Sequence, residues 1–377
     1  MKVCILSMQK VENIGSLLQS YGLKKMLEEV GCEVRFIDIE PNEQEDRAVK
    51  ETRHHFAGEF QSGDRRKKNL DRYFLNRLRN KLKLSLQDKE FEKFRVETLK
   101  IREEDNDEQY DLCVIGSDEV FNCMTTAGWG FTSQLFGNVR QSKRVITYAA
   151  SCGATEFSEL GGQAIEIITG AFRRVEGFSV RDSNTAQFVA NLSERSVNFH
   201  LDPVLVTDFS REMEQAELPK GLPADYCVVY SYRNRFHKPE EIQKIRKFCA
   251  AHRMVPITIG APQMWIRNFC VTSPFQALKV IQNAQFVVTD TFHGTIFSEK
   301  YCDRYAVMVR PSNANKLLDL IERIGLQEHV VNDLDDLEGV YNVEKDKVRP
   351  VRRQKAAREE SIRYLREIIW GDPRDHA

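Results

Sequence analysis

The 377-residue chain has no long hydrophobic run and almost no excess of either charge. Nowhere do about 18 apolar residues follow one another, which is the length that a membrane-spanning helix needs. The apolar run after Lys2 is also too short for a signal peptide, so we expect a cytoplasmic protein. With 55 Lys and Arg against 56 Asp and Glu, the net charge is −1, and no global field favours nucleic acid as a partner.

The nine cysteines do not form a pattern typical of disulfides or zinc. Their number is odd, and no two of them are separated by two residues. Cys4, Cys113 and Cys227 lie in apolar runs, where a free thiol behaves as a small hydrophobic side chain. We therefore predict neither a disulfide framework nor a bound metal.

The chain instead alternates strand-like and helix-like segments. Apolar runs predict strands at Lys2–Ser7, Glu33–Ile39, Asp111–Ile115, Arg144–Ala150, Gly177–Val180, Val197–His200, Asp225–Tyr232, Met254–Ile259, Gln285–Thr289 and Tyr305–Val309. Helical spacing predicts helices at Leu17–Val30, Pro239–His252, Pro274–Asn283, Thr295–Tyr301, Asn315–Ile324 and Val351–Trp370. This alternation predicts parallel sheets in two Rossmann-like α/β domains that face each other.

The length suits two domains of roughly 150–200 residues each. A connection over residues 208–224 separates an N-terminal domain (1–207) from a C-terminal domain (208–350), with a C-terminal helix and tail at 351–377. Residues 42–107 interrupt the first domain with a charge-dense stretch that includes Arg65–Lys68. Apolar spacing predicts that this insertion is helical, through Tyr73, Leu75, Leu78, Leu82 and Leu86. Its basic face fits a solvated surface, or a helix that approaches a membrane.

Polar residues follow several of the predicted strands, at the edge where open α/β sheets bind ligands. Asn13 and Gly15 lead into the first helix, whose N-terminus offers free N–H groups and partial positive charge to an anion. Gly116, Ser117 and Asp118 follow the third predicted strand, and a carboxylate there could accept hydrogen bonds from sugar hydroxyls. Both patterns also fit ordinary helix-capping turns.

Two further motifs carry groups suited to catalysis. Arg181 ends a strand, where its guanidinium can hold a phosphate or carboxylate with two hydrogen bonds, or simply pair with Asp182. His293 and Gly294 follow the buried strand that ends at Thr289. Histidine exchanges protons most easily near neutral pH, so His293 is our candidate for proton transfer.

In their order along the chain, these motifs resemble those of the polysaccharide pyruvyl transferase family. The matching segments are Asn13–Leu23, Gly116–Asp118, Tyr148–Gly153, Ser179–Asp182, Leu201–Pro203 and Asp290–Gly294. Each motif is weak alone, but all of them in this order are specific. The resemblance covers most of the chain, from the first predicted strand to Gly325.

The resemblance implies a GT-B-like fold with the active site between the domains. It implies transfer of pyruvate from phosphoenolpyruvate, the co-substrate, to two hydroxyls of a sugar or of a lipid-linked or polymeric glycan. The product would be a cyclic ketal in an exopolysaccharide or cell-envelope glycan, made in the cytoplasm or at the inner face of the membrane. The scheme requires no cofactor and no metal.

The family's catalytic arginine and histidine match Arg181 and His293. Some members have a donor-binding arginine where this chain has Thr291, so either another cation holds the phosphate or the donor is held differently. The donor-binding candidates are Arg181, Gly294, Arg310 and Lys316. The acceptor-binding candidates are Asn13, Gly15, Ser117 and Asp118. Two alternatives stay open at this point: a GT-B glycosyltransferase that uses a nucleotide sugar, and a non-catalytic relative that binds a glycan or a partner.

Overall fold

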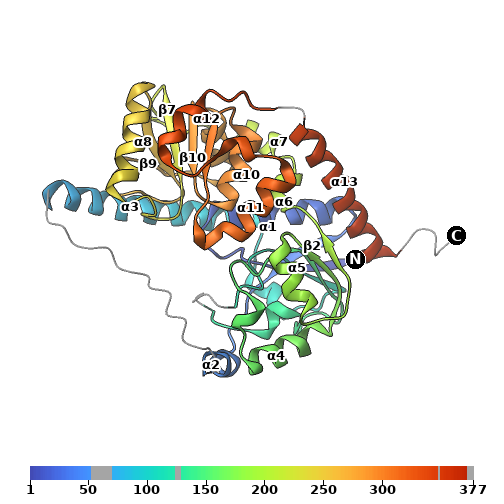
Figure 1. Ribbon diagram of the computed structural model, residues 1–377. Coiled ribbons are helices and arrows are strands. Elements are labelled where there is room, and N and C mark those ends of the chain that lie inside the picture. Colours follow the sequence, from blue (N-terminus) through green and yellow to red (C-terminus); the bar gives the residue numbers. More distant parts are fainter. Residues whose placement is uncertain (52–69, 124–128, 347–348, 372–377) are drawn as a thin grey trace.

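The computed structural model describes residues 1–51, 70–123, 129–346 and 349–371, with the side chains of all but 51, 70–79 and 349–350. The predicted basic segment Arg65–Lys68 lies outside these residues. Two α/β lobes lie one above the other in Figure 1, each built on its own six-stranded sheet. The prediction of two facing Rossmann-like domains is therefore confirmed.

The first sheet is parallel throughout, with strand order β2-β1-β3-β4-β5-β6. All seven residues of β3 are buried, as expected for a strand covered by helices on both faces. The strands are β1 (Lys2–Leu6), β2 (Glu33–Ile37), β3 (Leu112–Asp118), β4 (Val145–Ala150), β5 (Val175–Val180) and β6 (Val197–Phe199). The direction of winding reverses between β1 and β3, which makes that position the switch point where open α/β sheets bind ligands.

The second sheet is also parallel, with order β12-β11-β10-β7-β8-β9. Its strands are β7 (Tyr226–Tyr230), β8 (Val255–Ile259), β9 (Asn268–Cys270), β10 (Phe286–Thr289), β11 (Tyr305–Met308) and β12 (Val330–Val331). Counted from β7, this is the order 3-2-1-4-5-6 of dinucleotide-binding domains, with its switch point between β7 and β10. Sequence analysis missed β9 and β12, which are too short to show a periodicity.

Helices cover both faces of each sheet. In the first lobe and the connection they are α1 (Ile14–Glu29), α2 (Glu43–Glu51), α3 (Leu70–Phe94), α4 (Gly162–Phe172), α5 (Ser183–Ala190), α6 (Pro203–Val206) and α7 (Ser210–Gln215). In the second lobe they are α8 (Pro239–Ala251), α9 (Pro274–Gln282), α10 (Phe292–Tyr301), α11 (Ala314–Ile324) and α12 (Leu337–Tyr341), and α13 (Arg349–Trp370) ends the fold. No helix within the described ranges combines the length and apolar character needed to cross a bilayer.

The first helix, α1, is buried on more sides than a helix at the surface of a domain would be. Twelve of the sixteen residues of α1 are buried, because the helix lies between the two lobes. One hydrophobic core contains Val3 of the first sheet, Leu17 of α1 and Val228 of the second sheet. A helix that packs on both sides has no solvated face, so its sequence shows little amphipathic periodicity.

The helical insertion reaches across to the second lobe. In Figure 1, α3 runs along the base of that lobe, beside β9. The side chain of Gln87 donates a hydrogen bond to the carbonyl of Thr272 at 2.7 Å and accepts one from its amide at 3.0 Å. The apolar spacing predicted a helix here, and α3 is that helix, although Leu82 and Leu86 are 71% and 51% exposed, whereas Phe91 and Phe94 are buried. The side chains of Tyr73, Leu75 and Leu78 lie outside the described residues.

The last helix, α13, returns from the second lobe to the first (Figure 1). The hydroxyl of Tyr364 donates to the carbonyl of Thr147 at 3.3 Å, and the indole N–H of Trp370 donates to the carbonyl of Val30 at 2.9 Å. Leu365 is fully buried in the core that the two lobes share. The helix therefore fastens the end of the described chain to the lobe in which the chain begins.

We expect Leu365→Ala to lower the free energy of unfolding by about 2–5 kcal/mol, because it removes buried methyl groups and leaves a cavity. Val351→Ala, on the same helix but 61% exposed, serves as the control and should change that free energy by less than about 0.5 kcal/mol. Urea unfolding followed by circular dichroism measures both. Equal effects of the two substitutions would contradict the docking of α13.

Candidate active site

Two adjoining cavities lie at the switch points of the two sheets. The first-sheet cavity, of about 350 Å³, is lined by Ser16, Asp118, Glu119, Arg181 and Lys316 among others. The second-sheet cavity, of about 210 Å³, is lined by Ile14, Tyr230, Ser231, Arg233, Gly260 and Thr291 among others. Asn13, Tyr232 and His293 line both. The two ligand edges predicted from the sequence therefore meet at one place between the lobes.

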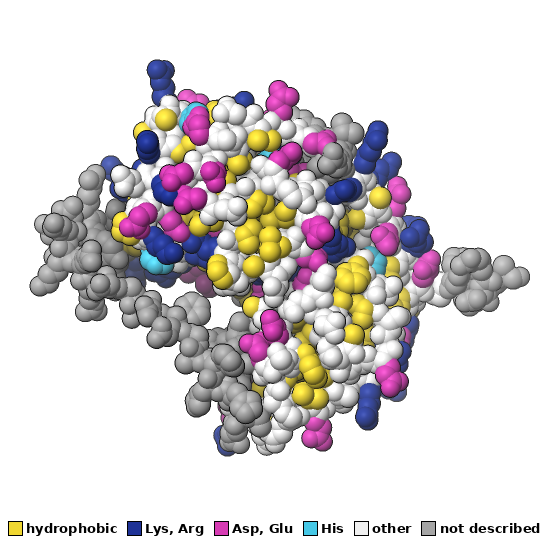
Figure 2. All heavy atoms as spheres, in the orientation of Figure 1, with side chains coloured by type: hydrophobic (Ala, Val, Ile, Leu, Met, Phe, Trp, Pro, Cys, Tyr) yellow, Lys and Arg dark blue, Asp and Glu magenta, His cyan; other side chains and the backbone are white. Residues whose placement is uncertain are grey.

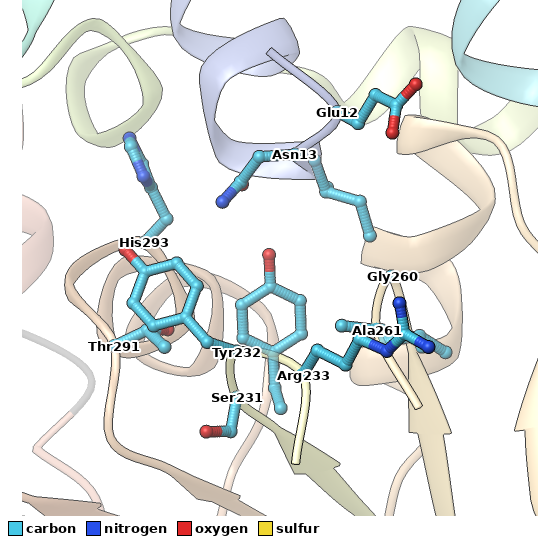
Figure 3. Close-up of a pocket in the computed structure, with 12 residues that line it drawn as sticks. Glu12, Asn13, Ser231, Tyr232, Arg233, Gly260, Ala261, Thr291 and His293 are labelled. Carbon is cyan, nitrogen blue, oxygen red and sulfur yellow. The ribbon is translucent and has the colours of Figure 1, made fainter. Parts of the chain in front are cut away.

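Figure 3 shows how the two lobes enclose the second-sheet cavity. Glu12 and Asn13 come from the start of α1 on one side. Tyr232 and Arg233, from the loop after β7, and His293, from the first turn of α10, come from the second lobe on the other side. A ligand in this cavity would contact both domains.

Arg181 is the centre of a buried ionic network. It follows β5, and its Nη1 donates to Oδ2 of Asp202 at 2.8 Å while Nη2 donates to Oδ1 of Asp118 at 3.2 Å. Its guanidinium carbon also lies 4.3 Å from the ring centre of Phe292, on α10 of the other lobe. Burial alone lowers the pKa of Arg181, but the two carboxylates outweigh this and raise it above its ordinary value. The group is therefore permanently charged.

Asp118 and Asp202 are held in their ionised form. Burial raises the pKa of Asp118, but Arg181, His293 and the hydrogen bond from Ser16 at 2.8 Å more than offset it, so the pKa lies below its usual value. Burial also raises the pKa of Asp202, and His293 and Arg181 reverse that shift in the same way. Both carboxylates are therefore charged hydrogen-bond acceptors at neutral pH.

His293 projects from the first turn of α10 toward α1. Its Nε2 lies 3.5 Å from Oδ2 of Asp202, longer than a normal hydrogen bond, and has no hydrogen-bond partner in the described part of the chain. A Cβ atom on Gly15 would lie 2.3 Å from Nδ1 and Cγ of His293. Only glycine at position 15 leaves room for the ring, so the steric role of Gly15 is to admit His293 to the cleft.

The remaining acceptor-side candidates differ in position. Asn13 is the N-cap of α1, where its Oδ1 accepts from the amide of Gly15 at 2.7 Å, and it lines both cavities. Ser117 is fully buried, and its hydroxyl donates to Oε1 of Gln19 at 2.7 Å. The Ser117 hydroxyl is therefore engaged inside the first domain and lines neither cavity.

Two of the donor-side candidates also lie outside the cavities. Arg310 donates to Asp290 at 2.6 Å and to Glu241 at 2.8 Å, so its charge is neutralised within the second domain. The amide of Gly294 donates to the cap residue Thr291, and a Cβ at this position would lie 2.1 Å from Oγ1 of Thr289. Arg310 and Gly294 therefore support the loop after β10 and line neither cavity.

Lys316 is in the first-sheet cavity, as expected of a site residue, but it is paired. Its ammonium group forms an ion pair with Glu119 of the first domain. Burial raises the pKa of Glu119, and Lys316 more than compensates, so the carboxylate is ionised. The pair joins the two lobes across the cleft.

Three residues of this arrangement were not among the sequence candidates. Asp202 was present in a recognised motif, and its position shortly after β6 and directly before Pro203 was a usable signal for a carboxylate at the ligand edge. Glu119 follows Asp118 in the same way. Tyr232 carries no local signal, because only the folding of the β7 loop toward α1 brings it into both cavities.

The comparisons with known proteins agree with this geometry. A model of the family described as polysaccharide pyruvyl transferase matches residues 13–301. No match is found among curated proteins. Among solved structures, a Methanocaldococcus jannaschii UDP-GlcNAc 2-epimerase in complex with UDP-GlcNAc and UDP is similar, with a TM-score of 0.52, 12% identity, and coverage of 98% of this chain and 100% of the other.

A UDP-N-acetylglucosamine 2-epimerase from Rickettsia bellii is similar to the same degree. Its TM-score is 0.52 at 10% identity, and the alignment covers 98% of this chain and 95% of the other. Identities this low concern the fold alone. Together with the two parallel-sheet domains, these likenesses confirm the GT-B-like fold.

We expect Asp202→Asn to destabilise the protein by about 3–5 kcal/mol at neutral pH, because it removes a carboxylate from a buried ion pair. The pKa of Asp202 in the folded protein lies below its ordinary value of 3.8. Its contribution is thus complete above that value and is lost as the pH falls through the lower, folded-state pKa. The difference in unfolding free energy between wild type and variant should therefore shrink below about pH 4.

Urea unfolding at a series of pH values measures this difference. Asp107→Asn is the control, because Asp107 has a side chain that is 87% exposed and should contribute little. A gap for Asp202→Asn that keeps its size into strong acid would show that the charge of Asp202 is not what stabilises the network.

Proposed function

The chain belongs to the polysaccharide pyruvyl transferase family, and we propose that it transfers pyruvate from phosphoenolpyruvate to two hydroxyls of a sugar or glycan precursor. The product is a cyclic ketal, and phosphate is released. The observation that carries this proposal is the group formed by Arg181, Asp118, Asp202 and His293 between the two switch points. It supplies a cation, carboxylates and a histidine in one cleft.

The proposed reaction begins with protonation of the enol ester. A proton added to C3 of phosphoenolpyruvate converts the CH₂ group to CH₃ and makes C2 electrophilic. A sugar hydroxyl attacks C2 and gives up its proton. The bond from C2 to the phosphate oxygen then breaks, and phosphate leaves with the electron pair. A second hydroxyl attacks C2 and closes the ketal. Of the two hydroxyl protons, one replaces that given to C3 and the other is taken up by phosphate.

The residues of the cleft suit these steps. His293 exchanges the proton, since its Nε2 has no hydrogen-bond partner among the described residues and Asp202 lies 3.5 Å away to orient the ring. Asp118, ionised and facing the first-sheet cavity, accepts a hydrogen bond from the attacking hydroxyl. Arg181 holds the carboxylate of the donor through Nε, an N–H that likewise has no partner within the described ranges. No cofactor or metal enters this scheme.

We expect His293→Ala to reduce phosphate release from phosphoenolpyruvate by about 10²–10⁴-fold when acceptor is present, which is the usual contribution of a positioned acid or base. Arg181→Lys should also abolish turnover, because lysine keeps the charge and loses the planar fork. A colorimetric phosphate assay measures both. His252→Ala is the control, since that ring packs on Tyr341 and lies in neither cavity. Wild-type rates of phosphate release in both the His293 and the Arg181 variant would contradict the proposed function.

Ligand-induced stabilisation distinguishes the proposed pyruvyl transfer from the alternative function, a glycosyltransferase that uses a nucleotide sugar. We expect phosphoenolpyruvate to raise the melting temperature and UDP- or GDP-sugars to leave it unchanged, because only a bound ligand stabilises the folded state, by about 2.7 kcal/mol at a concentration of 100 Kd. Differential scanning fluorimetry measures both ligands. The reverse result would favour a glycosyltransferase. A non-catalytic relative would show neither phosphate release nor a mass gain on any sugar.

A further inference from the structure

The donor must bring a phosphate into a cleft in which most cations are already neutralised. Arg181 and Lys316, which line the first-sheet cavity, are paired with three carboxylates, those of Asp118, Glu119 and the buried Asp202. These five groups carry one negative charge in excess. A phosphate placed among them would be repelled, whereas hydroxyl groups would find acceptors.

The second-sheet cavity has the opposite character. Arg233, on the loop after β7, lines it and forms no ion pair with another described residue. Glu12, the acidic residue of the lining, comes from the other lobe and also forms no ion pair within those ranges (Figure 3). The N-termini of α1 and α10 begin at Asn13 and Thr291 in the same lining and add partial positive charge.

The loop that carries Arg233 is fixed on both sides of it. Before it, the carbonyl of Tyr232 accepts from Gln263 at 2.8 Å. After it, the amide of Asn234 donates to the carbonyl of Pro262 at 3.2 Å, and Nε of Arg235 lies 3.3 Å from Oδ2 of Asp290. Asn234 also accepts from the amide of Met264 at 2.9 Å. The backbone at Arg233 is thus held while its side chain is free, which suits a binding group.

We propose that the second-sheet cavity is the phosphate subsite of the donor and that Arg233 is its cation. This assignment rests on the proposed function. Arg233 lines the same cavity as Thr291 and His293, so it supplies positive charge to that volume from the loop after β7. His293 also lines the first-sheet cavity, and the acceptor would lie there, beside Asp118. A volume of about 210 Å³ lies below the roughly 300–1,000 Å³ typical of drug-sized ligands and suits a compact anion.

Calorimetric titration with phosphoenolpyruvate, inorganic phosphate and pyruvate tests the assignment. Pyruvate has the carboxylate of the donor and lacks its phosphate. We expect Arg233→Gln to raise the Kd for phosphoenolpyruvate and phosphate by roughly 10- to 100-fold, the loss of one charge-assisted hydrogen bond, and to leave the Kd for pyruvate unchanged. Arg233→Lys should lie between the two. Arg267→Gln is the matched control, an exposed arginine of the same domain outside both cavities.

The outcomes separate this inference from the proposed function. If wild type and Arg233→Gln bind phosphoenolpyruvate equally, the subsite is overturned while the transfer reaction stands. If wild type binds phosphate through Arg233 but does not bind phosphoenolpyruvate, the phosphate subsite stands and the donor is overturned. If wild type binds neither, both are overturned. Glu12→Gln should tighten phosphate binding, since it removes a like charge from the lining, and weaker binding would count against the subsite.

Discussion

The buried guanidinium of Arg181 is the constraint on which the cleft depends. A charge that is removed from water must be paired, and breaking such a pair costs about 3–5 kcal/mol. Arg181 follows β5, and its partners follow β3 and β6, so three strands of one sheet must end in register for the pairing to form. Phe292 then covers the guanidinium from the other lobe. The network therefore fixes both the edge of the first sheet and the approach of α10.

The closeness of the lobes depends equally on α1. This helix is buried from both sides, and the core around it is continuous from one sheet to the other. Gly15 stands where any side chain would collide with His293. Two further contacts join the lobes: Lys316 pairs with Glu119, and Arg323 donates to the carbonyl of Arg181 at 2.7 Å. Charged side chains of both signs are spread over the outer face shown in Figure 2.

The sequence was sufficient for the features that depend on local pattern. Buried parallel strands are apolar runs such as Cys113–Ile115, and polar residues after them mark the ligand edge, which is how Asp118, Arg181 and His293 could be selected. It was insufficient where a side chain has several partners to choose from. Arg310 and Lys316 are both basic and near the same loop, but only the fold shows that Asp290 and Glu241 neutralise one while the other enters the cleft. Tyr232 and Arg233 could not be found for the same reason, since their role depends on a loop meeting a helix from another domain.

Thr291 stabilises the start of α10, and it carries no charge. Its Oγ1 accepts from the amide of Gly294 at 3.0 Å and caps α10. Such a cap contributes about 0.5–2 kcal/mol, and an arginine side chain, which has no acceptor, could not supply it. A threonine at position 291 therefore secures the helix that carries His293, and the cavity must draw its positive charge from elsewhere. The loop after β7 lines the same cavity. A cation on that loop therefore supplies positive charge to the cavity without weakening the cap of α10. A threonine at position 291 is thus compatible with the phosphate subsite that we propose for this cavity.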